Sequence, residues 1–224
     1  YLHNLLIGGD RLTHHPQHEQ PHRLFNNYGP TENTVVTTCG MIPAQPNATG
    51  ETPTIGRPIA NTRAYLLDQQ NQPVPIGIPG ELCIAGAGLA RGYLNQPALT
   101  AEKFIEVELF GQTERLYKTG DLARWLPDGN LEYLGRIDHQ VKLRGFRIEL
   151  GEIEAVLCQQ DVVCEAVVVV HERDGNKSLA AYLTAAAGEV PDTATLRDAL
   201  KARLPDYMVP NSFTVLDQMP LTPN

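Results

Sequence analysis

The sequence is poor in cysteine, has no excess of positive charge and contains no long hydrophobic run. Its 224 residues include only 4 cysteines, Cys39, Cys83, Cys158 and Cys164. None of them forms a CxxC pair, which favours free thiols in a reducing compartment over a disulfide framework. The formal net charge is -8, so nucleic acid is not an expected partner, because binding to a phosphate backbone requires a basic face.

The longest aliphatic run, Ala166–Val170, is far too short to cross a membrane. No secretory signal opens the sequence, so we expect a cytoplasmic protein without membrane contact. Four histidines lie between positions 14 and 22, but the two prolines in this stretch prevent a helix from aligning the imidazoles. We therefore interpret it as a solvated loop and not as a metal site.

The first part of the chain is typical of β structure. Between residues 35 and 134, short β-branched or aromatic runs alternate with Gly, Pro and Asn turns. Asn4–Gly9 predicts a short buried strand, and Pro127–Asn130 predicts a hairpin turn. One helix is expected at Pro97–Phe104, with Thr100 as its N-cap.

After Asp138 the pattern becomes that of a compact α+β unit. Residues 140–149 alternate as a hairpin with Gly145 at its bend, and two strands joined by a turn follow at 164–183. Two helices are indicated by apolar stripes, formed by Leu150, Ile153, Val156 and Leu157 and by Leu196, Leu200 and Leu204. The sequence therefore predicts two parts that join near residues 136–140.

Several polar groups lie at the expected turns, where binding residues tend to collect. Asp121 is interpreted either as a turn acid or as an acceptor for a ribose diol. Arg136 and Lys142 are solvated charges or phosphate ligands, and Tyr28 and Tyr133 are core aromatics or platforms for a base. The glycine-rich stretch at 86–93 lacks the Lys-Ser/Thr of a P-loop, which favours a structural turn over nucleotide contact.

Four stretches together resemble a known family. They are "NNYGPTEN", "GELCIAGAGLARGYLNQPALTAEKF", "YKTGDLARWLPDGNLEYLGRIDHQVKLRGFRIELGEIE" and "LPDYMVPNSFTVLDQMPLTPN". In this order they resemble the successive core motifs of nonribosomal peptide synthetase adenylation domains, relatives of acyl-CoA synthetases and luciferases. The resemblance covers essentially the whole chain.

The resemblance implies a fold of mixed α/β and α+β domains. Residues 1–137 would be the C-terminal, β-rich part of a large N-terminal domain, and residues 138–224 a small lid domain on a hinge. The implied reaction joins an amino acid to ATP, forming an aminoacyl-adenylate and pyrophosphate. The acyl group then passes to the phosphopantetheine thiol of a carrier domain, and a condensation domain is a further expected partner.

The resemblance also implies roles for the residues that match the motifs. Tyr28 would stack on adenine, Thr31 would contact the phosphates, and Glu32 would coordinate Mg²⁺. Asp121 would hold the ribose hydroxyls, and the strand end Gly8–Asp10, including Gly9, would line the adenine and substrate pockets.

Further matches concern the nucleotide and the second half of the reaction. Tyr133 would pack beside the nucleotide, and Arg136 would reach its ribose or phosphate oxygens. Asp138 matches the hinge residue, while Lys142 and Gly145 lie on the hairpin that would swing in for thiol transfer. Thr31, Glu32, Arg136 and Lys142 are thus the implied catalytic residues.

Five positions match the walls of the family's amino-acid pocket: Leu6, Gly8, Asn27, Val35 and Val36. They are uncharged and mainly aliphatic, and their order resembles that of leucine-activating domains. A hydrophobic pocket separates similar aliphatic groups by only about 1–3 kcal/mol per methylene, so another aliphatic substrate stays open. Val35 and Val36 are also compatible with ordinary strand positions.

The chain begins without Met and ends at "PLTPN", so we expect a fragment of a longer enzyme. The family's phosphate loop and the acidic residue for the substrate amino group would precede Tyr1, and a catalytic Lys would follow Asn224. We therefore expect the parent enzyme to be active and the chain alone to be inactive. An acyl- or aryl-CoA synthetase relative and a carrier-docking module without catalysis are the alternatives.

Overall fold

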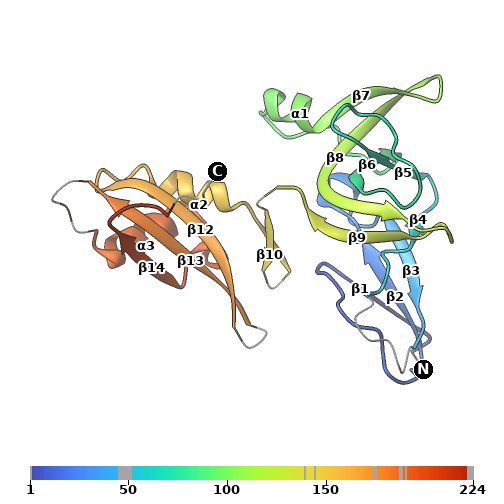
Figure 1. Cartoon of the computed structure of the whole chain (residues 1–224), viewed down its shortest axis with the longest axis horizontal. Helices are drawn as coiled ribbons and strands as arrows, with labels where there is room; N and C mark the ends of the chain where they lie inside the picture. The colour runs from blue at the N-terminus through green and yellow to red at the C-terminus, as the bar shows by residue number, and fades with distance from the viewer. Residues whose placement is uncertain are drawn as a thin grey trace. The chain divides into compact units, whose positions relative to one another are not determined.

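The computed structural model describes residues 2–44, 52–138, 140–143, 145–173, 176–186, 189 and 191–220. The chain forms two compact units, residues 1–138 and 139–224 (Figure 1). Within the described ranges, no helix is long and apolar enough to cross a membrane.

The first unit begins with a four-stranded sheet of order β1-β2-β3-β4. Its strands are β1 (Asn4–Gly8), β2 (Arg23–Tyr28), β3 (Thr38–Ile42) and β4 (Arg57–Pro58). Strand β1 pairs with β2 in parallel, whereas the other neighbours are antiparallel. The prediction of a buried first strand is wrong: β1 lies at the sheet edge, and the Leu6 side chain is 62% exposed.

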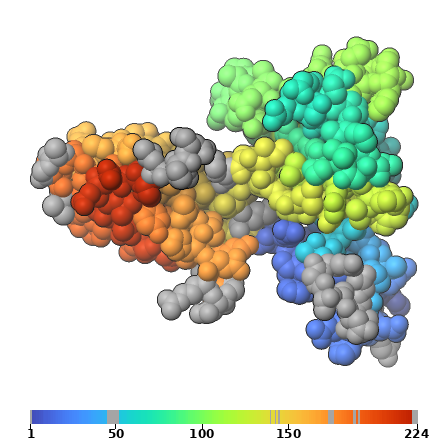
Figure 2. Space-filling model, in the orientation of Figure 1, coloured from blue at the N-terminus to red at the C-terminus, as the bar shows by residue number. Residues whose placement is uncertain are grey.

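A second, antiparallel sheet follows in the order β5-β6-β8-β7, and β9 also pairs with β8. The strands are β5 (Thr62–Leu67), β6 (Gly80–Gly86), β7 (Phe104–Leu109), β8 (Gln112–Trp125) and β9 (Leu131–Arg136). In the space-filling view, these strands form one continuous body (Figure 2). The long strand β8 pairs with β7 along its first half and with β9 along its second half.

The local signals of this sheet are largely confirmed. Residues Pro127–Asn130 form the predicted hairpin turn, which Leu126 closes by donating its N–H to the Asn130 carbonyl at 2.8 Å. Helix α1 (Pro97–Lys103) is also present. Its N-cap is Gln96 and not Thr100, because Pro97 occupies the first helical position, where a missing N–H costs nothing.

The second unit starts with the predicted hairpin, β10 (Val141–Leu143) and β11 (Phe146–Ile148). Gly145 lies at its bend with a φ of +82°, a left-handed conformation that favours glycine. Helix α2 (Leu150–Leu157) follows and buries the predicted stripe.

A three-stranded sheet of β12 (Val163–Arg173), β13 (Asn176–Ala185) and β14 (Ser212–Leu216) packs against the helices of this unit. Helix α3 (Thr193–Lys201) is capped by the Asp192 carboxylate, and a short 3₁₀ turn, η2 (Asp206–Met208), leads to β14. Leu196 and Leu200 are buried on α3 as predicted, and Leu204 is buried just beyond its end.

Candidate functional site

The Asp121 carboxylate is the centre of a buried polar cluster in the first unit. Asp121 lies on β8 opposite Arg136 of β9, and its side chain is only 4% exposed. It accepts a hydrogen bond from the Tyr28 hydroxyl, a 2.9 Å bond from Arg136 Nη1 and a 3.4 Å bond from the Tyr133 hydroxyl. The cluster therefore joins β2, β8 and β9 around one anion.

Arg136 connects this carboxylate to a second one. Its Nε and Nη2 atoms donate to the two Asp138 oxygens at 2.6 Å each, and Nη2 also donates to the Thr119 carbonyl at 3.0 Å. Burial alone would lower the pKa of Arg136. The hydrogen bonds to Asp138 and the charge of Asp121 outweigh that effect and raise the pKa, so the guanidinium stays charged.

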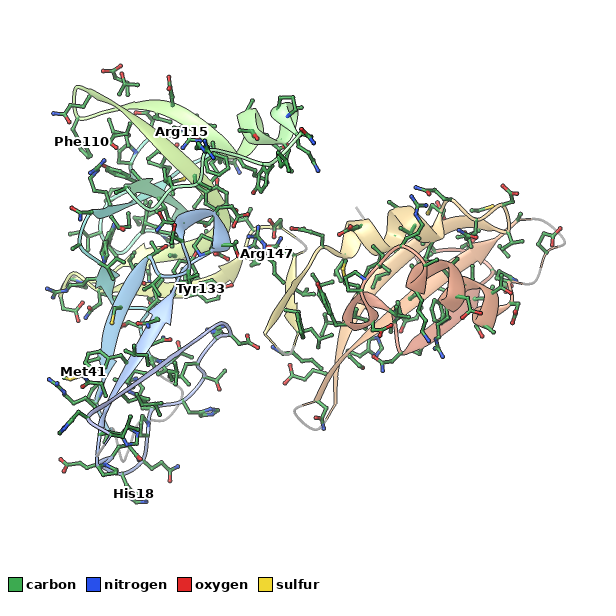
Figure 3. The ribbon with its side chains drawn as sticks, turned by 180° about the vertical axis from the view of Figure 1, so that it is seen from behind. His18, Met41, Phe110, Arg115, Tyr133 and Arg147 are labelled. Atoms are coloured by element: carbon green, nitrogen blue, oxygen red, sulfur yellow. The ribbon has the colours of Figure 1, made fainter. Side chains whose placement is uncertain are left out.

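Two tyrosine rings flank the cluster, and Figure 3 labels Tyr133 on its strand. The ring centroids of Tyr28 and Tyr133 are 6.2 Å apart with an interplanar angle of 38°. Burial, and then the Asp121 charge, raises the pKa of both phenols, so both remain neutral hydrogen-bond donors. Tyr28 is a core aromatic that packs with Ile55 and Leu66 and turns its hydroxyl toward Asp121.

A tight turn holds Glu32 near the end of β2. Thr31–Asn33 forms a 3₁₀ turn, η1, in which Thr31 is exposed and Glu32 is 8% exposed. A Cβ atom at Gly29 would lie 2.4 Å from the Val35 carbonyl oxygen, so only glycine allows the chain to return this closely. The Tyr93 hydroxyl donates to Glu32 Oε1 at 2.7 Å.

The glycine-rich stretch at 86–93 is a structural turn, as the sequence favoured. It packs on η1: the Ala90 N–H donates to the Glu32 carbonyl at 2.8 Å, and the Thr34 hydroxyl donates to the Gly88 carbonyl at 2.7 Å. A Cβ at Gly88 would lie 2.8 Å from Asn33 Oδ1. The close contact accounts for glycine at this position without a phosphate.

The expected pocket residues fall into two groups. Leu6, Gly8 and Asn27 share one face of the first sheet, because Gly8 pairs with Asn27 and alternate residues point to the same side. A Cβ at Gly8 would lie 2.5 Å from the Asn27 carbonyl oxygen. Within the described residues, the buried Asn27 Oδ1 has no hydrogen-bond partner.

Val35 and Val36 form the second group, in the turn between η1 and β3. Their interpretation as strand residues is wrong, since Val35 has a φ of +74° and is 71% exposed. The turn reverses the chain at Gly29, which forces this left-handed backbone on a β-branched residue.

The remaining positions lie at loops and hairpins. Gly9 has a φ of +99°, and the exposed Asp10 accepts a 2.7 Å hydrogen bond from the Arg11 N–H. Lys142 is on β10, but its side chain lies outside the described part of the structure.

Two polar residues of the site were missed by sequence reasoning, Thr119 and Tyr93. The Thr119 hydroxyl donates to the Leu82 carbonyl at 2.6 Å and accepts from the Asp121 N–H at 3.0 Å. A threonine two residues before an acidic turn residue is a weak signal for such a bond. No local pattern indicates that the Tyr93 hydroxyl reaches Glu32, 61 positions away.

Comparison with protein families decides the class. A family model described as AMP-binding enzyme matches residues 2–94, and one described as AMP-binding enzyme C-terminal domain matches residues 152–224. The chain belongs to the AMP-binding enzyme family. This family member is 52% identical to a linear gramicidin synthase of Brevibacillus parabrevis, over 100% of the chain and 4% of that protein. Tyrocidine synthase 3 of the same organism is 51% identical, over 100% of the chain and 3% of that protein.

Solved structures agree with this assignment. Holo-PA1221, an NRPS protein containing adenylation and PCP domains, is 35% identical with a TM-score of 0.81, over 99% of this chain and 38% of that one. NpsA-ThdA, an artificially fused adenylation-PCP di-domain NRPS from Klebsiella oxytoca, is 30% identical with a TM-score of 0.78, over 95% of this chain and 42% of that one. The chain thus spans a small part of its curated relatives and under half of these structures. The family resemblance and the mixed fold class predicted from the sequence are confirmed.

Proposed function

We propose that this chain is part of an amino-acid-activating ligase that forms an aminoacyl-adenylate from ATP and passes the acyl group to a carrier thiol. The observation that carries the proposal is the buried Asp121 cluster, in a chain that belongs to the AMP-binding enzyme family. The similarity to gramicidin and tyrocidine synthases favours an amino acid over another carboxylic acid as the substrate.

Asp121 would accept hydrogen bonds from the ribose diol of the nucleotide. An ionised carboxylate only accepts hydrogen bonds, and Asp121 is held in place by Arg136 from β9 and by the Tyr28 hydroxyl from β2. Arg136 would carry positive charge toward the nucleotide oxygens, with Asp138 fixing its guanidinium from the other side. The Tyr28 and Tyr133 rings would border the base.

Glu32 is the residue that would hold Mg²⁺. Among the described residues, no group of three or more potential ligands forms a self-contained metal centre. Mg²⁺ commonly uses one or two protein carboxylates together with substrate phosphates, and the single, buried Glu32 beside the exposed Thr31 hydroxyl fits that pattern. When bound there, the ion would neutralise negative charge on the phosphates during adenylation.

The amino-acid side chain would lie against the face that carries Leu6, Gly8 and Asn27, with Val35 and Val36 on the adjoining turn. We propose leucine or another aliphatic amino acid as the substrate, because none of these five side chains is charged. Residues 139–224 would serve as the lid domain, with Lys142 and Gly145 on the hairpin used in thiol transfer. Two of the similar structures contain a PCP domain beside the adenylation domain, which supports a carrier domain as partner. A condensation domain would act next.

Amino-acid-dependent exchange of pyrophosphate into ATP tests this function in the full-length protein that carries the chain. We expect exchange with leucine or another aliphatic amino acid, and loss of exchange in Asp121→Ala. Exchange that depends on a carboxylic acid without an amino group would instead assign the protein to the acyl-CoA-forming relatives. An absence of exchange with every amino acid would refute the proposal.

A further inference from the structure

Tyr93 touches the same carboxylate that the proposed function assigns to the metal. Its hydroxyl donates to Glu32 Oε1 at 2.7 Å. Burial first, and then the hydrogen bond to Glu32, raises the pKa of Tyr93, which keeps the proton on the phenol. A hydrogen bond to an ionised acceptor is shorter and stronger than one between neutral groups, so it can fix the rotamer of the buried Glu32 side chain.

Tyr93 is itself held from three sides. Its N–H donates to the Thr100 hydroxyl at 2.9 Å, which ties it to helix α1. Its ring packs edge-on against Phe104, with centroids 5.7 Å apart. A Cβ at Gly92 would lie 2.4 Å from Thr100 Cγ2, so the glycine before Tyr93 permits this close approach to the helix.

Arg115 of β8 completes the support, and Figure 3 labels it on that strand. Its guanidinium carbon lies 4.7 Å from the centroid of the Phe104 ring, and its two terminal nitrogens donate to the carbonyls of Ala90 and Arg91 at 3.0 and 2.9 Å. The backbone before Tyr93 is thus attached to the sheet. The same stretch is bonded to η1 through Ala90 and the Glu32 carbonyl.

We propose that Tyr93 is a positioning residue that holds the Glu32 carboxylate in the orientation needed to bind a divalent cation together with ATP. The inference rests on the proposed function, since it requires Glu32 to be a metal ligand. The glycine-rich stretch at 86–93 then has a functional consequence without contacting the nucleotide: it carries the hydroxyl that orients the ligand. Such outer groups commonly change metal affinity about 10–100-fold when removed.

Binding of Mn²⁺ tests the role without measuring turnover. In the full-length protein, electron paramagnetic resonance would measure Mn²⁺ affinity in the presence of a non-hydrolysable ATP analogue. Calorimetry would measure the analogue alone, without metal. Three variants are compared: Tyr93→Phe, Glu32→Gln and the control Tyr182→Phe, which removes a hydroxyl that bonds His171 at an exposed site on β13.

We expect Tyr93→Phe to weaken Mn²⁺ binding about 10-fold, while metal-free binding of the analogue and the Tyr182→Phe variant stay unchanged. The phenyl ring keeps the packing on Phe104, and circular dichroism checks that the variant folds. Replacing Tyr93 by para-aminophenylalanine, which keeps the ring and a hydrogen-bond donor, should restore part of the lost affinity.

Three outcomes would overturn the inference, and they are distinguishable. Unchanged Mn²⁺ affinity in Tyr93→Phe, with weakened affinity in Glu32→Gln, would refute the positioning role and leave the proposed function intact. Equal weakening with and without metal would reduce Tyr93 to a general structural role. Unchanged Mn²⁺ binding in Glu32→Gln would refute the metal role of Glu32 itself, and the inference with it.

Discussion

Removing the Asp121 carboxylate is expected to destabilise the first unit in a way that a second substitution partly reverses. In Asp121→Ala, the Tyr28 hydroxyl, on a side chain only 7% exposed, loses its acceptor. Arg136 loses one partner but keeps Asp138 and the Thr119 carbonyl. The change therefore orphans one buried donor fully and one buried cation only in part.

The magnitude follows from these two losses. An unsatisfied buried hydroxyl costs about 1–3 kcal/mol. Breaking a buried ion pair outright costs about 3–5 kcal/mol, but the Asp138 bonds retain most of the charge compensation for Arg136. We expect a total loss of about 3 kcal/mol for Asp121→Ala. In Tyr28→Phe/Asp121→Ala the orphaned hydroxyl is absent, so the double variant should be about 1 kcal/mol more stable than the sum of the single effects.

Urea unfolding monitored by tryptophan fluorescence measures this directly, because the single tryptophan, Trp125, lies on β8 four residues after Asp121. Glu106→Ala, an exposed substitution on β7, is the control and should stay within about 0.5 kcal/mol of the original chain. Additive single effects in the double variant would show that Tyr28 and Asp121 are not coupled. A loss below about 1 kcal/mol in Asp121→Ala would refute the buried cluster altogether.

Three further predictions concern alkaline stability, thiol reactivity and packing. Burial raises the pKa of Tyr28, so the folded chain keeps a proton that the unfolded chain releases near pH 10; stability should therefore fall as pH rises from about 9 to 11, and less steeply in Tyr28→Phe. Alkylation followed by mass spectrometry should modify the exposed Cys158 and Cys164 first and Cys83 last, because burial raises the pKa of the Cys83 thiol to about 12. Gly88→Ala should lower the urea midpoint by the equivalent of about 1–3 kcal/mol, since its Cβ would press on Asn33; an unchanged midpoint would contradict the packing of residues 86–93 on η1.

Features that depend on neighbouring residues could be predicted from the sequence. The hairpin turn at Pro127–Asn130 and the bend at Gly145 follow from turn chemistry, and the buried stripe of α2 follows from helical periodicity. The start of α1 was misplaced at Thr100 because two competing local signals were present, and the fixed φ of Pro97 prevailed over the capping hydroxyl.

Features that depend on sheet register could not be read from local patterns. Asp121 meets Arg136 because β8 and β9 pair with a register shift between Leu122 and Ala123, a detail that no residue type announces. Tyr28 reaches Asp121 across 93 positions, and only the family resemblance brought the two into one proposed site. The exposure of Leu6 depends on the place of β1 at the sheet edge, which its apolar composition does not indicate.

The most direct test of the account is whether Asp121 recognises the ribose diol of ATP. Calorimetry on the full-length protein would compare ATP with its 2′,3′-dideoxy analogue, in the original protein and in Asp121→Asn. We predict at least about 10-fold tighter binding of ATP by the original protein, because a hydrogen bond to a charged group contributes about 1.5–3 kcal/mol. In Asp121→Asn this preference should disappear. A preference for ATP that survives in Asp121→Asn would contradict the central claim.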